Sequence, residues 1–163
     1  MTTTHLDAWI AAGRAHDAEL AASALAADAE LVSPLTDGFV FSGPGEIREL
    51  LSAVFEAVAD YRPVSSMQDG RTAVVVGRAM VRGVALEEFQ HLELAEDGRI
   101  ARITIAMRPL PAITAFAREL GPVLAQRQGN PRAARTLRFA GAFLDNVAAT
   151  GDRRFIPLAA PQR

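Results

Sequence analysis

Two polar residues interrupt an otherwise apolar strand face near the middle of the chain. Asp97-Gly98 separates two alternating segments, and this dipeptide is a strong signal for a two-residue hairpin turn. Counting outward from the turn places Glu88 and Gln90 on the apolar face. A carboxyl group facing an apolar space has its charged form disfavoured, so its pKa rises toward the range useful for acid–base catalysis. We therefore expect Glu88 to be the catalytic candidate and Gln90 to contact a ligand.

The same register identifies the wall around these two residues. It pairs Glu88 with Met107, Gln90 with Ile105 and Leu92 with Ile103, which makes Ile103, Ile105 and Met107 candidate substrate-binding residues. Ala101 is expected on this inner face too. A second hairpin around Gly83-Val84 would place Gly77 opposite Gln90, and we expect that small residue to leave open space above the sheet.

Two further candidates come from outside these strands. Trp9 falls on the apolar stripe of the first expected helix, and Ser33 lies near the end of the first expected strand. Both are candidate substrate-binding residues, with Trp9 and Gln90 as polar anchors and Glu88 as the only inner titratable group. Each candidate also has a structural interpretation. Glu88 would be solvated at the rim, Gln90 would bond to a helix backbone, Trp9 would pack in the core and Ser33 would cap the strand.

The elements that must position these residues follow from periodicity and capping signals. A helix at 111–124 can close the mouth of the site with Ile113 and Phe116. The last expected helix carries Leu137, Ala140, Leu144 and Val147 on one side, and the tail from Gly151 reads as a loop. Helices are expected at 4–15, 17–25, 43–58, 111–124 and 132–149, and strands at 29–35, 39–41, 71–82, 85–95 and 100–107.

Composition excludes several kinds of chemistry. The chain of 163 residues is half apolar, enough for one domain with a substantial core. It has no cysteine, and every basic residue is arginine, which excludes thiol nucleophiles, iron–sulfur clusters, lysine Schiff bases and the usual pyridoxal-phosphate chemistry. His5, His16 and His91 lack metal-ligand spacing, so neither a metal nor a cofactor is expected.

Charge and the chain ends indicate which partners to expect. The formal net charge of −2 offers no field that would recruit nucleic acid or an anionic membrane. No apolar run approaches the roughly 18 residues of a spanning helix, and the N-terminus lacks the features of a leader, so a cytoplasmic protein is expected. Val74, Val76, Met80 and Phe89 would form an apolar patch on the outer sheet face. Such a patch predicts a homodimer.

The order of elements, together with four local signals, resembles the NTF2-like superfamily, specifically its SnoaL-like and ketosteroid-isomerase-like branch. The signals are His16-Asp17, Ala26-Ala27-Asp28-Ala29-Glu30, Ser42-Gly43-Pro44-Gly45-Glu46-Ile47 and Asp97-Gly98-Arg99-Ile100. The resemblance implies an α+β fold in which a curved antiparallel sheet wraps around three helices from the N-terminal half, as a cone open to a small apolar molecule. It implies an NTF2-like domain at 1–128 and a helical extension with a tail at 129–163.

The resemblance also shows departures from the family's catalytic pattern. Trp9 stands where the isomerases of this superfamily place a tyrosine, Ser33 where they place the general-base aspartate and Gln90 where they place a protonated aspartate. Serine at its ordinary pKa cannot accept a carbon acid's proton, and glutamine cannot shuttle one. We therefore expect negligible steroid isomerisation. The inner acid or base of SnoaL-like cyclases has only Glu88 as a possible replacement, and the Asp-Arg-Asp set of related epoxide hydrolases has no inner aspartate to match.

Two functions of different classes remain open at this point. One is a cofactor-independent cyclase, isomerase, dehydratase or hydrolase acting on a small apolar carbonyl or polycyclic substrate. The other is a non-catalytic ligand-binding or assembly module that kept the cone and lost the acid–base residues. The three substitutions favour the second, whereas the inner Glu88 favours the first.

Overall fold

A single six-stranded sheet organises the computed structural model, which describes residues 4–161. The strand order is β2-β1-β6-β5-β4-β3, and all neighbours are antiparallel except β1 and β6, which run parallel. This architecture is the expected α+β fold. The strands are β1 (Leu25–Val32), β2 (Phe41–Ser42), β3 (Ala59–Asp69), β4 (Thr72–Val81), β5 (Val84–Leu94) and β6 (Ile100–Arg108).

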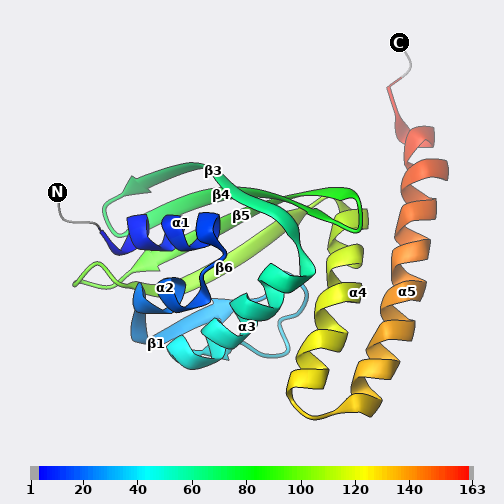
Figure 1. Ribbon diagram of the computed structural model, residues 1–163. Helices are drawn as coiled ribbons and strands as arrows, with labels where there is room; N and C mark the ends of the chain where they lie inside the picture. Colours follow the sequence, from blue (N-terminus) through cyan, green and yellow to red (C-terminus); the bar gives the residue numbers. More distant parts are fainter. Residues whose placement is uncertain (1–3, 162–163) are drawn as a thin grey trace.

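The helices surround one face and one end of this sheet (Figure 1). Helices α1, α2 and α3 lie against the concave face, α4 stands at the open end, and α5 packs against the outer side of α4. Among residues 4–161, no helix lies on the opposite, convex face of the sheet. The helices are α1 (His5–Ala15), α2 (Ala18–Ser23), α3 (Gly43–Ala57), α4 (Leu110–Arg127) and α5 (Pro131–Arg154), followed by the 3-10 turn η1 (Ile156–Ala159).

Local capping fixes where the first helices begin. The Thr4 hydroxyl accepts a hydrogen bond from the Asp7 amide at 3.0 Å, and the Asp7 carboxylate accepts one from the Thr4 amide at 3.1 Å. Asp17 caps α2 by accepting from the Leu20 amide at 2.9 Å. These caps satisfy amides that have no partner within the helix. The start of α1 also determines its phase, so that Trp9 turns toward the sheet and is buried.

The register of the hairpin between β5 and β6 is confirmed. Glu88 pairs with Met107, Gln90 with Ile105 and Leu92 with Ile103, as expected from Asp97-Gly98. The one difference lies close to the turn, where Leu94 pairs with Ile100 through a register shift. A bulge inserts one extra residue. Consequently Ile100 is fully buried in the core and Ala101, expected there, is only half-buried.

The hairpin between β4 and β5 turns one residue earlier than expected. Its two-residue turn is Arg82-Gly83, since Val81 pairs with Val84. Both turn residues have positive φ, +49° and +78°, as a type I′ turn requires. The pairing therefore shifts by two residues, and Gly77 lies opposite Glu88 instead of Gln90. Because side chains alternate with a period of two, the faces remain as expected.

The C-terminal helix differs most from expectation. It continues to Arg154, so the loop expected from Gly151 is wrong. The expected side of Leu137, Ala140, Leu144 and Val147 is exposed, and the residues buried against α4 are Ala134, Gly141 and Ala148. At the other end of the chain, β1 begins at Leu25, four residues before the expected start. Over residues 4–161, no helix combines the length and apolar character needed to cross a membrane.

Candidate functional site

A cavity of about 60 Å³ lies between the concave face of the sheet and the helices. Helix α4 closes it on one side with Phe116 and Leu120, whereas Ile113, expected at the mouth, does not line it. The remaining wall is mainly apolar. It includes Leu31, Leu51, Val54, Phe55, Ile105 and Met107. An apolar pocket with a few convergent polar groups is the usual form of a small-molecule site.

Four side chains from three elements form a hydrogen-bonded network in the wall of this cavity. The Trp9 indole N–H donates to Gln90 Oε1 at 2.7 Å. Gln90 Nε2 donates to Glu88 Oε1 at 2.5 Å and to the Tyr61 hydroxyl at 3.0 Å. The Tyr61 hydroxyl in turn donates to Glu88 Oε1 at 2.8 Å. The hydrogen bonds thus form a chain from Trp9 through Gln90 and Tyr61 that ends at a single oxygen of Glu88.

The other oxygen of Glu88, Oε2, takes no part in this network. Within residues 4–161, no side chain or backbone group donates a hydrogen bond to Oε2. No fully enclosed side-chain nitrogen or oxygen in that range lacks a partner, so Oε2 is not sealed in the core. Glu88 also lines the cavity while remaining only 7 % exposed. Oε2 is therefore the oxygen of Glu88 that the network leaves without a hydrogen-bond partner.

Burial controls the protonation of this site. It raises the pKa of Glu88 above the ordinary glutamate value, and the hydrogen bonds from Tyr61 and Gln90 oppose that rise in part. Burial also raises the pKa of Tyr61 well above 10, and the nearby charge of Glu88 adds to the effect. Tyr61 therefore remains a neutral donor, whereas Glu88 is the group that can exchange a proton.

Two glycines make room for the Tyr61 ring. A Cβ on Gly77 would lie 2.8 Å from Tyr61 Cε2, and a Cβ on Gly13 would lie 2.9 Å from Tyr61 Cε1. Real Cβ atoms essentially never make contacts this short, so both positions require a glycine while the Tyr61 ring stays in place. The space that we expected above Gly77 is therefore filled by Tyr61. Gly13 in α1 and Gly77 in β4 hold the phenol between them, beside Glu88.

Tyr61 is the residue that sequence reasoning missed. It also corrects the expectation that Glu88 is the only inner titratable group, because the phenol lies in the same network. A register shift in β3 between Ala59 and Arg62 prevents a simple count from placing it. Two signals were available: Tyr61 is the only tyrosine of the chain, and it lies near the start of β3, two residues before Pro63, which pairs with Gly77.

The other candidates are distributed as follows. Ser33 lines the cavity, and its hydroxyl accepts from the Leu35 amide at 3.1 Å, which is a turn-capping contact. Ile105 and Met107 lie in the cavity wall. Ile103 is fully buried in the core and is not part of that wall. Glu88 lies inside the cone and not at a solvated rim. Across residues 4–161, no three His, Asp or Glu side chains gather as a metal site would require.

A curved sheet with helices on its concave face and an apolar cavity between them defines a cone-shaped class of α+β domain. Comparison with family models identifies the particular family: residues 6–103 match the SnoaL-like domain. The match spans more than half of the chain, so the protein belongs to the SnoaL-like family, within the NTF2-like superfamily. A search of curated proteins finds no match.

Solved structures show the same fold. A steroid delta-isomerase from Pseudomonas aeruginosa is 24% identical, with a TM-score of 0.70 over 77% of this chain and 92% of that one. A protein from Silicibacter pomeroyi described as having a cystatin-like fold is 17% identical, with a TM-score of 0.71 over 81% and 95%. A putative polyketide cyclase from Sinorhizobium meliloti is 24% identical, with a TM-score of 0.52 over 62% and 92%. Identities this low establish the fold alone.

The buried packing of the Tyr61 ring gives a direct prediction. Because Tyr61 is the only tyrosine, the absorbance of phenolate reports on this side chain alone. In the native protein, phenolate should form only well above pH 10, as measured by rapid pH jumps before alkaline unfolding. Gly77→Ala should displace the ring into a more solvated position and lower its pKa toward 10.

Gly45→Ala provides the matched control, because an added Cβ there meets nothing within 4 Å. It should leave the phenolate titration unchanged. A phenolate titration in Gly77→Ala identical to that of the unmodified protein would contradict the packing described here.

Proposed function

We propose that this protein binds a small, mainly apolar molecule bearing a carbonyl oxygen, and that Glu88 exchanges a proton with it through Oε2. The observation that carries the proposal is that the two oxygens of the buried Glu88 carboxyl group have different hydrogen-bond surroundings. Tyr61 and Gln90 both donate to Oε1, whereas Oε2 accepts no hydrogen bond within residues 4–161 and Glu88 lines the cavity. A group of raised pKa in an apolar cleft is a candidate for acid–base catalysis.

The network supports Glu88 in both of its protonation states. Burial favours the neutral acid, which can donate from Oε2 to the oxygen of a bound carbonyl. The donors at Oε1 stabilise the carboxylate, which can accept a proton from a carbon next to that carbonyl. A single residue can therefore move a proton in either direction. Trp9 acts indirectly, because its hydrogen bond to Gln90 Oε1 holds the amide so that Gln90 Nε2 donates to the Tyr61 hydroxyl and to Glu88.

Two considerations support an apolar carbonyl compound as the ligand class. The wall is apolar except for the network and Ser33, and so offers few partners for a charged molecule. In addition, two structural neighbours are described as a steroid delta-isomerase and a putative polyketide cyclase. Isomerisation, cyclisation and dehydration each use proton transfer beside a carbonyl, so one shared step can be tested before the natural substrate is identified.

A non-catalytic binding protein is the second candidate, and a specific observation favours it. The Ser33 hydroxyl is engaged by the Leu35 amide, and Trp9 and Gln90 bond to each other. The three positions that match the catalytic residues of family isomerases thus carry no acid or base. On this alternative, Glu88 anchors a ligand by a hydrogen bond and transfers no proton.

Deuterium exchange of a model ketone separates these candidates. With 2-tetralone in deuterated buffer, NMR should show faster loss of the protons next to the carbonyl in the presence of the protein. Glu88→Gln should reduce this acceleration by about 10²-fold or more, because the amide cannot accept a proton from carbon. Under either candidate function, Gln90→Leu should weaken the binding of 2-tetralone. The fluorescence of Trp9, the only tryptophan, measures that binding.

Glu93→Gln is the matched control and should leave the exchange rate unchanged, because Glu93 lies on the same strand as Glu88 but is exposed on the opposite face of the sheet. Binding of 2-tetralone without accelerated exchange would favour the non-catalytic candidate. Equal exchange rates for the unmodified protein and Glu88→Gln would contradict the catalytic role of Glu88.

We also propose that two copies associate through the convex face of the sheet. Phe89 is 39% exposed on this face, with Val74, Val76 and Met80 half-buried on the neighbouring strand. Ion pairs of Glu87 with Arg78 and Arg108 lie beside the patch and provide polar contacts at its edge. Contiguous apolar surface with a polar rim is typical of protein interfaces.

Light scattering at micromolar concentration should therefore give the mass of a dimer. Phe89→Glu should convert it to a monomer by placing an unpaired charge in the interface, while Thr136→Glu on exposed α5 should not. A monomeric mass for the unmodified protein would contradict the proposal.

A further inference from the structure

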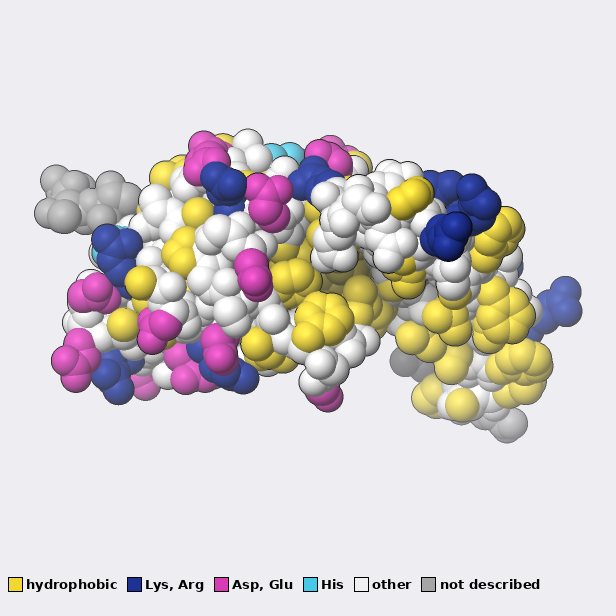
Figure 2. Space-filling view, turned by 90° about the horizontal axis from the view of Figure 1, so that it is seen from below, with side chains coloured by type: hydrophobic (Ala, Val, Ile, Leu, Met, Phe, Trp, Pro, Cys, Tyr) yellow, Lys and Arg dark blue, Asp and Glu magenta, His cyan; other side chains and the backbone are white. Residues whose placement is uncertain are grey.

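The outward face of α5 exposes large apolar side chains that the fold does not use. Phe139 and Phe143 are 74% and 69% exposed, and Val147 continues the same line at the next helical turn. Their spacing of four residues places all three on one face. Beyond the helix, Phe155, Ile156 and Leu158 are exposed as well. Figure 2 shows apolar side chains gathered at this end of the molecule, with arginines beside them.

The packing of α5 on α4 explains why these side chains face outward. The buried residues of α5 are small: Ala134, Gly141 and Ala148. A Cβ on Gly141 would lie 2.8 Å from Arg118 Cα, so the two backbones approach closely along this contact. The small residues therefore form the inner side of α5. The phenylalanines, on the opposite side, contribute little to the stability of the chain by itself.

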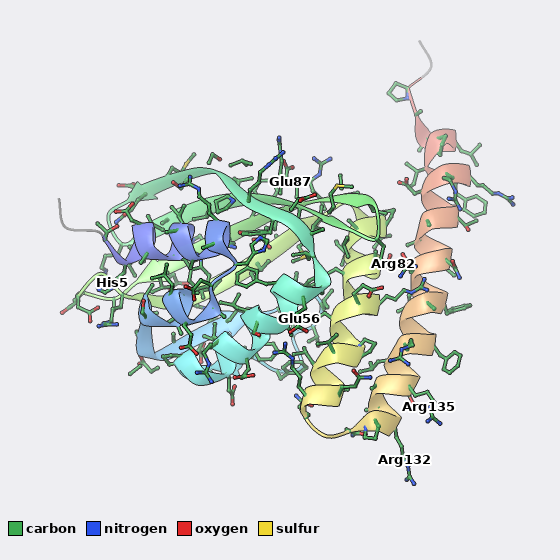
Figure 3. All side chains as sticks on the ribbon, viewed as in Figure 1. His5, Glu56, Arg82, Glu87, Arg132 and Arg135 are labelled. Atoms are coloured by element: carbon green, nitrogen blue, oxygen red, sulfur yellow. The ribbon has the colours of Figure 1, made fainter. Side chains whose placement is uncertain are left out.

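The charges of α5 are also divided between its two sides. Its first acid, Asp145, turns inward and accepts a hydrogen bond from Arg118 at 3.0 Å. Asp152 follows seven residues later, on the same side of the helix. The outward face has arginines at both ends of the apolar line, Arg132 and Arg135 before it and Arg154 after it, and all three are exposed. Figure 3 shows Arg132 and Arg135 pointing away from the body of the molecule.

This division extends over the whole chain. Residues 1–130 contain 11 arginines and 17 acids, a formal charge of −6, whereas residues 131–163 contain 6 arginines and 2 acids, a charge of +4. The two parts sum to the net charge of −2, from which we expected no attraction to an anionic membrane. That expectation considered only the total. The molecule instead has a basic, aromatic end and an acidic body.

Charge complementarity selects the occupant of this face. Antiparallel pairing of two α5 helices about Phe143 would bring Arg132 of one copy against Arg154 of the other, and parallel pairing would bring each arginine against itself. Like charges in contact disfavour both arrangements. A surface with negative charges and an apolar layer below them satisfies the arginines and the phenylalanines together.

We propose that the outward face of α5 binds the surface of an anionic lipid bilayer, with Phe139, Phe143 and Val147 entering the interface and Arg132, Arg135 and Arg154 contacting lipid phosphates. The helix lies on the membrane and does not cross it. The exposed Phe155, Ile156 and Leu158 extend the same contact beyond the end of α5. The acidic body then faces away from the bilayer.

Vesicle flotation with the full chain tests this proposal. The protein should float with vesicles of phosphatidylglycerol and phosphatidylcholine, and not with phosphatidylcholine alone. Binding should weaken as salt is raised, because salt screens the arginines. Arg132→Gln with Arg135→Gln should reduce binding about 25-fold, since each basic residue near such a surface contributes roughly fivefold. Phe139→Gln with Phe143→Gln should reduce it at least as much.

Two controls use exposed residues of the β3–β4 hairpin, one in β3 and one in its turn. Met67→Gln removes an apolar side chain that is also highly exposed, and Arg71→Gln removes an exposed arginine. Neither should alter flotation, and circular dichroism should show that all variants are folded. Absence of binding to phosphatidylglycerol vesicles, or equal binding to both kinds of vesicle, would overturn the proposal. Dissociation of an oligomer in the Phe139→Gln and Phe143→Gln variant would also overturn it, since the face would then be a protein interface.

Discussion

The burial of one carboxyl group is the constraint on which the candidate site depends. Glu88 is enclosed in the cone, and a buried carboxylate is tolerated only where hydrogen bonds replace water. Its partners come from separate parts of the chain: Tyr61 from β3, Gln90 from β5 and, through Gln90, Trp9 from α1. The position of α1 over the sheet and the two glycines around Tyr61 are therefore requirements of the site as well as of the fold. They leave one carboxylate oxygen without a hydrogen-bond partner among the described residues.

Local sequence signals predicted the part of the site that lies within one hairpin. Asp97-Gly98 determined the register of β5 and β6, and therefore which face carries Glu88 and Gln90. The turn at Arg82-Gly83 was misplaced because an arginine adopts the left-handed conformation there, although the faces survived a shift of two residues. Tyr61 was not predicted, because its place depends on an irregular strand and on close approach to glycines distant in the sequence. Ile103 was assigned to the correct face, but the face extends beyond the cavity.

The C-terminal helix illustrates a different limit of sequence reasoning. Periodicity correctly placed Leu137, Ala140, Leu144 and Val147 on one side of α5, but it could not tell which side the rest of the molecule covers. Here the small residues are buried, because Gly141 allows the α4 and α5 backbones to approach closely. A SnoaL-like cone thus carries an additional helix whose outward chemistry is independent of its cavity. We infer two separate binding surfaces, one for a small molecule inside the cone and one for a membrane on α5.

The most direct test of the central claim compares the stability of the unmodified protein and Glu88→Gln as a function of pH. In the unfolded chain Glu88 should titrate near 4.5, whereas burial raises its pKa in the native state. Between these two pKa values the native state holds a proton that the unfolded state has lost, so stability falls as pH rises, by up to about 1.4 kcal/mol per pH unit. Glu88→Gln lacks this proton. Urea unfolding should therefore show the variant gaining stability relative to the unmodified protein as pH increases above 4.5. A difference that is independent of pH, or that changes in the opposite direction, would contradict a buried Glu88 of raised pKa.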